Sequence, residues 1–228
     1  MNYEGDLTLL CDLPEMFPKE KLPVKFHFIQ PYFIESETDE IEVKQFLETR
    51  PGKKNILISF RSTGDFRKVK FIKDLLFKDF NFIVSGDFPE GLKADNIFCK
   101  KFINNGAILN QLDLMICHGG NGTTYQALAF GVPLLAMPVI FEQYWNVEAL
   151  KRLEVGEELD SHLGNEEKKA AMIFWMNRKR NSNLLHIMES MMQAQEPKGD
   201  YLKISSLLNN LINKKSPADL TTGDFNFN

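Results

Sequence analysis

The feature that most constrains the fold is a unit of two apolar runs joined by a glycine loop and a short helical segment. The first run, residues 114–117, ends at His118, and the loop GGNG follows at 119–122. A helix is predicted over 125–130, and the second apolar run occupies 134–137. Two strands connected through a helix run parallel with a right-handed crossover, so this unit predicts part of a parallel sheet.

The glycine loop has the properties of an anion-binding site. Glycines let the backbone approach a ligand closely, and the start of a helix presents free N–H groups together with the positive end of its dipole. Thr123 and Thr124 add hydroxyl donors, and His118 stands at the carboxyl end of a strand, where ligands bind in open α/β sheets. A tight turn between a strand and a helix, without any ligand, is the alternative for the loop taken alone.

Two common phosphate loops do not fit these residues. The loop has no Gly-Lys-Ser/Thr sequence, so it is not a Walker loop. When the dinucleotide-binding pattern is started at Gly120, its last position falls on Tyr125 instead of glycine or alanine.

Apolar runs alternate with helical periods along the rest of the chain. Further strands are predicted at 55–60, 81–85, 96–99 and 155–159. Helices are predicted at 65–80, 143–153, 166–195 with a break at 177–183, and 201–211. This alternation predicts an α/β fold, a doubly wound, Rossmann-like parallel sheet with helices on both faces.

Three regions are predicted along the chain. Residues 1–34 form a proline-rich arm with short strands at 7–11 and 25–29. Residues 35–213 form the main domain, which begins with a charged linker and turn over 35–55. Residues 214–228 are polar and predicted to be a disordered tail.

Composition excludes several classes of function. A net charge of −4 argues against a nucleic-acid partner, which needs a basic surface. The longest apolar run, residues 132–141, has ten residues and two prolines, so no membrane span is expected. The three cysteines lack metal-ligand spacing, and no metal site is expected. We expect the cysteines to be buried free thiols in a reducing compartment. The amino terminus does not resemble a signal peptide, so a cytoplasmic protein is expected.

A longer pattern surrounds the loop. It reads His-Gly-Gly-x-Gly-Thr, then Ala-Leu, Gly-Val-Pro, Met-Pro, an acid followed by Gln, and Asn. This pattern resembles the donor-binding signature of GT-B nucleotide-sugar glycosyltransferases, most nearly the family 1 UDP-glycosyltransferases. The resemblance runs without gaps over residues 102–150 and more loosely over 6–211. It implies that residues 35–213 are the nucleotide-sugar-binding, C-terminal half of a GT-B architecture.

The resemblance also implies roles for individual residues. Phe102 would stack on the uracil, His118 would contact the diphosphate, and position 126 would bind the ribose hydroxyls. The nucleotide and diphosphate set is Phe102, Asn105, His118, Gly120, Asn121, Gly122, Thr123 and Gln126, and the donor-sugar pair is Glu142 and Gln143. Phe102 as a core side chain and the acid at 142 as a helix cap are the alternatives.

The chain departs from the family pattern at the nucleoside. Asn104 and Asn105 stand where the family has Pro and Gln. Gln126 stands where the family has Glu, and an amide offers one acceptor oxygen and no charge. Ribose binding is therefore expected to be weaker, or the partner to be different. A solvent-facing helix residue is the alternative for Gln126.

The implied reaction is an inverting transfer of a glycosyl group, of the hexosyltransferase type, from a UDP-sugar to a hydroxyl acceptor. No cofactor is implied beyond the UDP-sugar as co-substrate. The family's general base is a histidine of the first domain, so no catalytic residue is expected within this chain. The implied partner is an N-terminal acceptor domain or a partner subunit. Residues 12–14 and 30–31 resemble the link between the two halves, although an ordinary N-terminal arm is the alternative.

Two other functions stay open from the sequence. A UDP-sugar epimerase uses a similar fold and would release UDP without an acceptor. A non-catalytic or regulatory nucleotide-sugar-binding subunit would fit the changes at positions 105 and 126.

Overall fold

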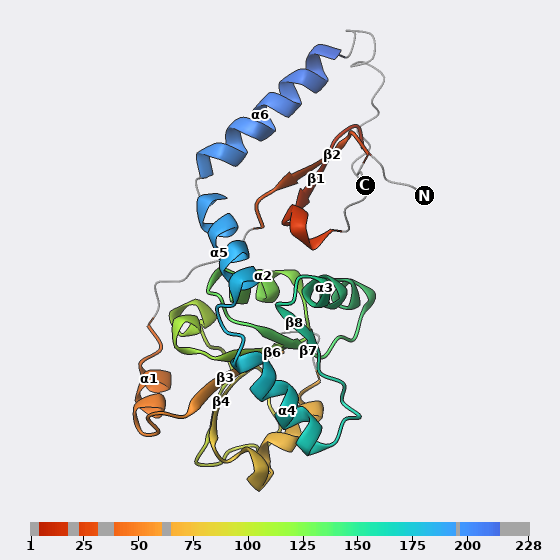
Figure 1. Ribbon diagram of the computed structural model, residues 1–228. Helices are drawn as coiled ribbons and strands as arrows, with labels where there is room; N and C mark the ends of the chain where they lie inside the picture. Colours follow the sequence, from red (N-terminus) through yellow and green to blue (C-terminus); the bar gives the residue numbers. More distant parts are fainter. Residues whose placement is uncertain (1–4, 18–22, 32–38, 61–64, 195–196, 215–228) are drawn as a thin grey trace, which may run out of the picture.

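A six-stranded parallel sheet forms the centre of the molecule (Figure 1). The computed structural model describes residues 5–17, 23–31, 39–60, 65–194 and 197–214. The sheet consists of β3 (Lys54–Ser59), β4 (Phe80–Ser85), β5 (Ile97–Lys100), β6 (Leu114–Cys117), β7 (Leu134–Ala136) and β8 (Gly156–Glu158). Every pair of neighbouring strands is parallel.

The strand order is β5-β4-β3-β6-β7-β8. The chain runs outward from β3 through β4 to β5, returns to β6 on the other side of β3, and continues outward to β8. This is the strand order of the doubly wound dinucleotide-binding fold, and ligands in such sheets bind where the order reverses, at the carboxyl ends of the strands. The predicted doubly wound sheet is confirmed, and the reversal lies between β3 and β6.

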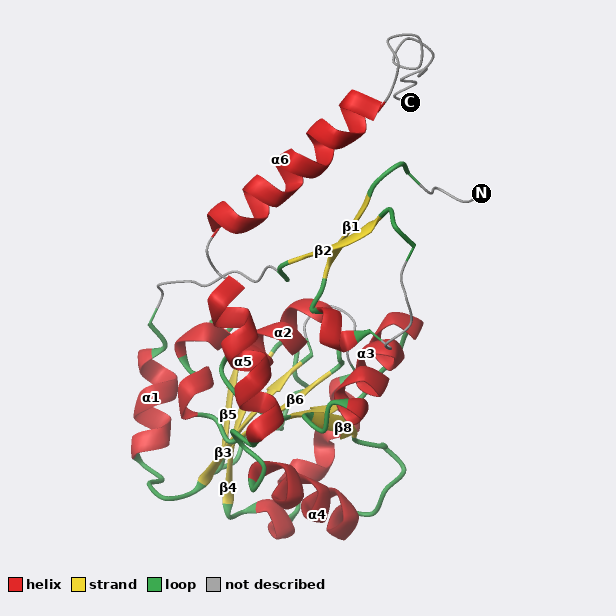
Figure 2. Ribbon diagram, turned by 45° about the horizontal axis from the view of Figure 1, so that its top comes forward, coloured by secondary structure: helices red, strands yellow, loops and turns green. Residues whose placement is uncertain are grey.

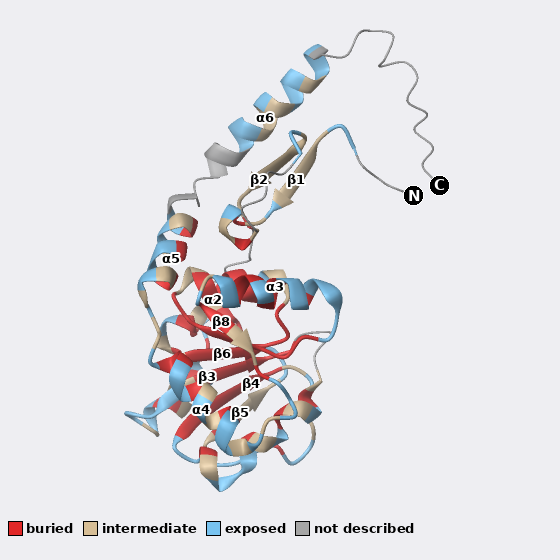
Figure 3. Ribbon diagram, turned by 45° about the vertical axis from the view of Figure 1, so that its right-hand side comes forward, coloured by how far each residue is buried: buried red, intermediate tan, exposed pale blue. Residues whose placement is uncertain are grey.

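Helices cover both faces of the sheet, and most residues of the sheet are buried (Figure 3). One face packs against α1 (Ile41–Glu48), α2 (Asn121–Ala129), α3 (Phe141–Arg152) and α5 (Ser182–Ala194). The other face packs against α4 (Asn165–Met176) and the 3₁₀ segments η2 (Phe66–Lys73) and η3 (Leu75–Phe77). Strand residues alternate between the two layers, as a pleated sheet requires: Ile56 and Ile58 face one core and Leu57 the other.

The α-helix predicted over 65–80 is wrong in type. Two 3₁₀ segments occupy this stretch, and Phe80 already belongs to β4. Their buried residues Phe66, Val69 and Ile72 recur every three positions, which matches the three residues per turn of a 3₁₀ helix. The Asp74 carboxylate separates the two segments by accepting a hydrogen bond from Leu76 N–H at 2.9 Å.

The linker predicted over 35–55 is also wrong for its described part, because α1 occupies its middle. Val43 and Leu47 lie one helical turn apart and are buried against the sheet. Phe46 packs on Phe98 with ring centroids 5.7 Å apart. The spacing of Val43 and Leu47 is therefore helical, although most of the residues around them are polar or charged.

The arm forms a separate two-stranded parallel sheet of β1 (Thr8–Cys11) and β2 (Phe26–Ile29). The last helix, α6 (Pro197–Lys214), extends away from the main domain on the side of this small sheet (Figures 1 and 2). Lys203 Nζ donates to the Phe28 carbonyl at 2.5 Å. The predicted tail, apart from Lys214, lies outside the described residues.

The thiols differ from one another. Cys117 is buried, and burial raises the pKa of its thiol to about 12. Cys99 is half-buried with a pKa raised by burial to about 11, and Cys11 is exposed, so the expected burial of all three cysteines is wrong. In the described part of the chain, no helix is long and apolar enough to cross a membrane.

Candidate nucleotide-binding site

The glycine loop joins β6 to α2 at the point where the strand order reverses. Gly119 has a φ of +84°, a conformation that glycine adopts without strain. Gly120 is the N-cap of α2, so the helix begins at Asn121, four residues earlier than predicted. The first N–H groups of the helix therefore face the loop without intrahelical acceptors. A Cβ at Gly122 would meet nothing within 4 Å, which leaves open space beside these groups.

His118 lies against this loop. A Cβ on Gly120 would come within 2.5 Å of His118 Nε2, so only glycine at 120 leaves room for the imidazole where it lies. His118 is buried at the carboxyl end of β6, with Ser59 of β3 level with Cys117 in the neighbouring strand. The predicted His118, Gly120, Asn121, Gly122 and Thr123 are thus brought together.

The loop is held in place by Asn146 of α3. Its Nδ2 donates to the Gly119 carbonyl at 2.8 Å and to Asn121 Oδ1 at 2.7 Å. Asn146 belongs to the sequence pattern, but the pattern alone indicates no role for it. These hydrogen bonds hold the backbone of the loop in place, and the Asn121 side-chain oxygen takes part in them.

The arm is tied to the same helix. Tyr125 Oη donates to Asp12 Oδ1 at 2.7 Å and accepts from Leu13 N–H at 3.2 Å. Burial raises the pKa of Asp12, Glu142 raises it further, and the Tyr125 hydrogen bond offsets part of the rise. Burial and the Asp12 carboxylate raise the pKa of Tyr125. These contacts fix the position of residues 12–14 against α2.

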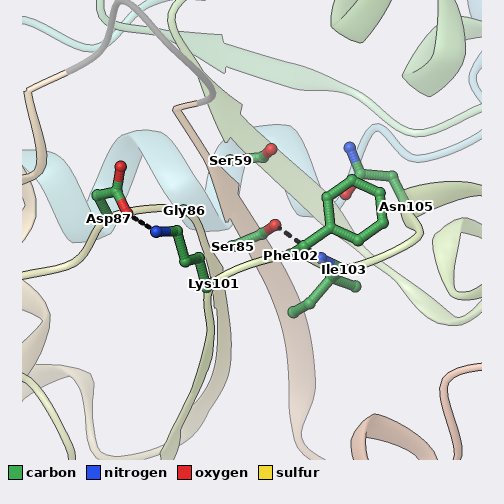
Figure 4. A pocket seen from close by; sticks show the side chains of 8 residues that line it. All are labelled: Ser59, Ser85, Gly86, Asp87, Lys101, Phe102, Ile103 and Asn105. Carbon is green, nitrogen blue, oxygen red and sulfur yellow. Dashed lines mark hydrogen bonds and ion pairs between the residues drawn. The ribbon is translucent and has the colours of Figure 1, made fainter.

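A pocket of about 330 Å³ lies on the same edge of the sheet (Figure 4). It opens at the carboxyl ends of β3, β4 and β5, and its lining consists of Ser59, Ser85, Gly86, Asp87, Lys101, Phe102, Ile103 and Asn105. Phe102 is 69% exposed, which excludes the alternative that it is a core residue. Its ring is available as a stacking surface beside the pocket.

The segment that carries Phe102 is anchored by two side chains. Ser85 Oγ accepts from Ile103 N–H at 3.2 Å, and Glu40 Oε1 accepts from Asn104 N–H at 2.7 Å. Glu40 is 3% exposed, and its other oxygen accepts from Lys100 Nζ at 2.9 Å. The carboxylates of Glu40 and Glu42 raise the pKa of Lys100. We did not predict Glu40, since a single acid in a charged stretch carries no signal of burial.

Asn105 and Gln126 meet between the pocket and the loop. Asn105 Nδ2 donates to Gln126 Oε1 at 3.4 Å, and the two residues are 2% and 4% exposed. Asn105 opens the 3₁₀ segment η4 (Asn105–Ala107), and Gln126 lies in the second turn of α2. Both departures from the family pattern thus fall in one buried contact.

The two residues predicted to bind the donor sugar lie at the start of α3. Gln143 Oε1 accepts from Val139 N–H at 2.8 Å and from Ile140 N–H at 3.3 Å, so it caps the helix. Glu142 is exposed at the surface next to it. Glu142 is the acid in the first turn of α3, the position that the helix-capping alternative requires, whereas the capping hydrogen bonds come from Gln143. A contact of either residue with a sugar stays a prediction.

The assembled edge offers an aromatic ring, a buried amide pair and a glycine loop at a helix start. Such groups suit a base, a sugar ring and a diphosphate respectively. Among the described residues, no three His, Cys, Asp or Glu side chains are grouped to hold a metal ion.

Comparisons with known proteins find glycosyltransferases. The model of the glycosyltransferase family 28 C-terminal domain matches residues 41–199. A PGL/p-HBAD biosynthesis glycosyltransferase of Mycobacterium tuberculosis is 27% identical over 183 residues, which cover 75% of this chain and 40% of that protein. This chain therefore spans less than half the length of that relative.

Solved structures show the same fold. The glycosyltransferase SnogD from Streptomyces nogalater matches with a TM-score of 0.67 at 20% identity, over 88% of this chain and 56% of that one. The spinosyn rhamnosyltransferase SpnG, complexed with thymidine diphosphate, matches with a TM-score of 0.62 at 16% identity, over 83% and 54% of the two chains.

Proposed function

The chain belongs to the glycosyltransferase family 28 C-terminal domains, and from this premise we propose that it binds a UDP-sugar for transfer of the glycosyl group to a hydroxyl acceptor. The observation that carries the proposal is the shared edge of the sheet: Phe102 and its pocket, the Asn105–Gln126 contact and the His118 loop all lie at the carboxyl ends of the strands. This is the edge at which open α/β sheets bind their ligands.

In the proposed complex, the base stacks on Phe102 and the diphosphate lies at the glycine loop. The helix N–H groups and His118 then contact the group that leaves in the reaction. Donors that meet a developing charge lower the barrier by stabilising the transition state more than the bound substrate. His118 thus serves the departing diphosphate and is not the base that activates the acceptor.

The acceptor and the general base are proposed to come from an N-terminal acceptor domain or a partner subunit. The M. tuberculosis relative is a glycosyltransferase of which this chain matches 40%. A base that removes the acceptor proton contributes about 10²–10⁴-fold to such reactions. We therefore assign binding and orientation of the donor to the residues described here.

Calorimetric titration with UDP tests the proposal. UDP should bind at one site, and Phe102→Ala should weaken binding by about 1–3 kcal/mol through loss of the base–aromatic stack. Phe174→Ala is the matched control, because Phe174 is a half-exposed phenylalanine on α4 and does not line the pocket. Absence of UDP binding would contradict the proposed function, and equal losses in the two variants would contradict the placement of the base.

A further inference from the structure

The contact between Asn105 and Gln126 is an uncharged pair at the centre of the site. Both side chains are amides, both are almost fully buried, and one hydrogen bond of 3.4 Å joins them. A buried amide carries donors and acceptors but no charge, so it favours a ligand hydroxyl less strongly than a carboxylate does.

The position of the pair determines which part of a nucleotide it meets. Asn105 follows Phe102 by three residues, and Gln126 lies on the helix that begins at the glycine loop. In a nucleoside diphosphate, the sugar ring lies between the base and the phosphates. If the base stacks on Phe102 and the diphosphate lies at the loop, which rests on the proposed function, the sugar ring faces the amide pair.

The two side-chain oxygens of the pair differ in their hydrogen bonds. Gln126 Oε1 already accepts the Asn105 amide. Asn105 Oδ1 is buried and accepts from no donor among the described residues, although Asn105 lines the pocket. A buried acceptor without a donor is unfavourable, so this oxygen is the natural partner for a ligand hydroxyl. The pair presents one unused oxygen of this kind.

We propose that the Asn105–Gln126 pair limits the preference of the site for ribonucleoside over 2′-deoxyribonucleoside diphosphates to less than about 12-fold. The ring of 2′-deoxyribose has one hydroxyl to donate, which matches the one unused oxygen. Ribose has a second hydroxyl, and without a carboxylate this group gains only a neutral hydrogen bond. The pair is thus a specificity-determining element for the nucleoside of the donor.

The expected discrimination follows from the strength of the hydrogen bonds. A neutral hydrogen bond is equivalent to a factor of roughly 2–12 in affinity, and one to a charged group to a factor of roughly 12–160. The ratio of the dissociation constants of 2′-deoxy-UDP and UDP should therefore lie below about 12.

Calorimetric titration of the 228-residue chain with UDP and with 2′-deoxy-UDP measures this ratio directly. A ratio below about 12 supports the inference, and a ratio above about 12 overturns it. If neither nucleotide binds, the proposed function itself is wrong and the inference falls with it. A failure of selectivity is therefore distinguishable from a failure of the site.

A substitution tests the role of the pair. Gln126→Glu places a carboxylate beside Asn105 Nδ2 and should raise the ratio by about 5-fold or more, because both ribose hydroxyls then donate to a charged group. Gln45→Glu adds the same charge on the exposed side of α1 and should leave the ratio unchanged. An unchanged ratio in folded Gln126→Glu overturns the inference. If that variant does not fold, the ratio of the dissociation constants of 2′-deoxy-UDP and UDP for the parent chain still supports or overturns the inference.

Discussion

His118 and Gly120 depend on each other at the mouth of the loop. The imidazole occupies the space that any Cβ at residue 120 would need, with only 2.5 Å between that Cβ and Nε2. The glycine thus gives the backbone its approach to a ligand and gives the histidine its position. A side chain at residue 120 would therefore displace the imidazole from this position.

Replacement of His118 tests its proposed contact with the diphosphate. His118→Ala should weaken UDP binding by about 1–3 kcal/mol, the usual cost of losing a charge-assisted hydrogen bond. His162→Ala is the control, since His162 is exposed in the loop before α4. Calorimetry on both variants gives the comparison. Parent-like affinity in His118→Ala would show that the imidazole is structural.

The types of the site residues were predictable, whereas their partners were not. The glycine loop and His118 follow an apolar run directly, so their place at a strand end could be read along the chain. The contacts of Glu40 with Asn104 and of Asp12 with Tyr125 join residues 64 and 113 positions apart. Such contacts arise from the packing of elements, which a pattern in one segment does not specify.

Buried strands were predicted more accurately than the helices between them. β3, β4 and β6 each contain a run of at least three apolar residues because the sheet is covered on both faces, and such runs can be recognised from the sequence alone. In η2, a spacing of three residues was interpreted as an α-helical face. In α1, the surrounding charges concealed a face formed by Val43 and Leu47. For amphipathic segments such as these, tertiary contacts determine whether an α-helix, a 3₁₀ helix or a loop forms.

The attachment of the arm to α2 should contribute measurably to stability. Tyr125→Phe removes the hydroxyl that joins Asp12 to the Leu13 N–H and leaves a buried donor without a partner. We expect a loss of about 1–3 kcal/mol in the free energy of unfolding, measured with urea. Tyr144→Phe on the half-exposed surface of α3 should change it by less than about 0.5 kcal/mol. Equal stability of Tyr125→Phe and the parent would show that the arm is not held by this contact.

The 228-residue chain should bind a donor without transferring its sugar. The proposed acceptor pocket and general base belong to another domain or subunit, and an unaccompanied donor site neither orients an acceptor nor excludes water. The assay combines the purified chain with UDP-glucose, UDP-N-acetylglucosamine and a panel of hydroxyl acceptors. Multiple turnovers of glycoside formation would contradict the prediction and would place a base among these residues.

The reversal of strand order also governs how the molecule is assembled. Strands β3, β4 and β5 are consecutive in the chain, as are β6, β7 and β8, and within the described sheet the two groups pair through β3 and β6. In that pairing Ile56 lies beside Leu114, a separation that delays contact because a long loop must close first. We therefore expect the pairing of β3 with β6 to form later than the pairing of β3 with β4. The proposed nucleotide site has residues from both groups of strands. A bound nucleotide would therefore stabilise the folded arrangement of the two groups against unfolding.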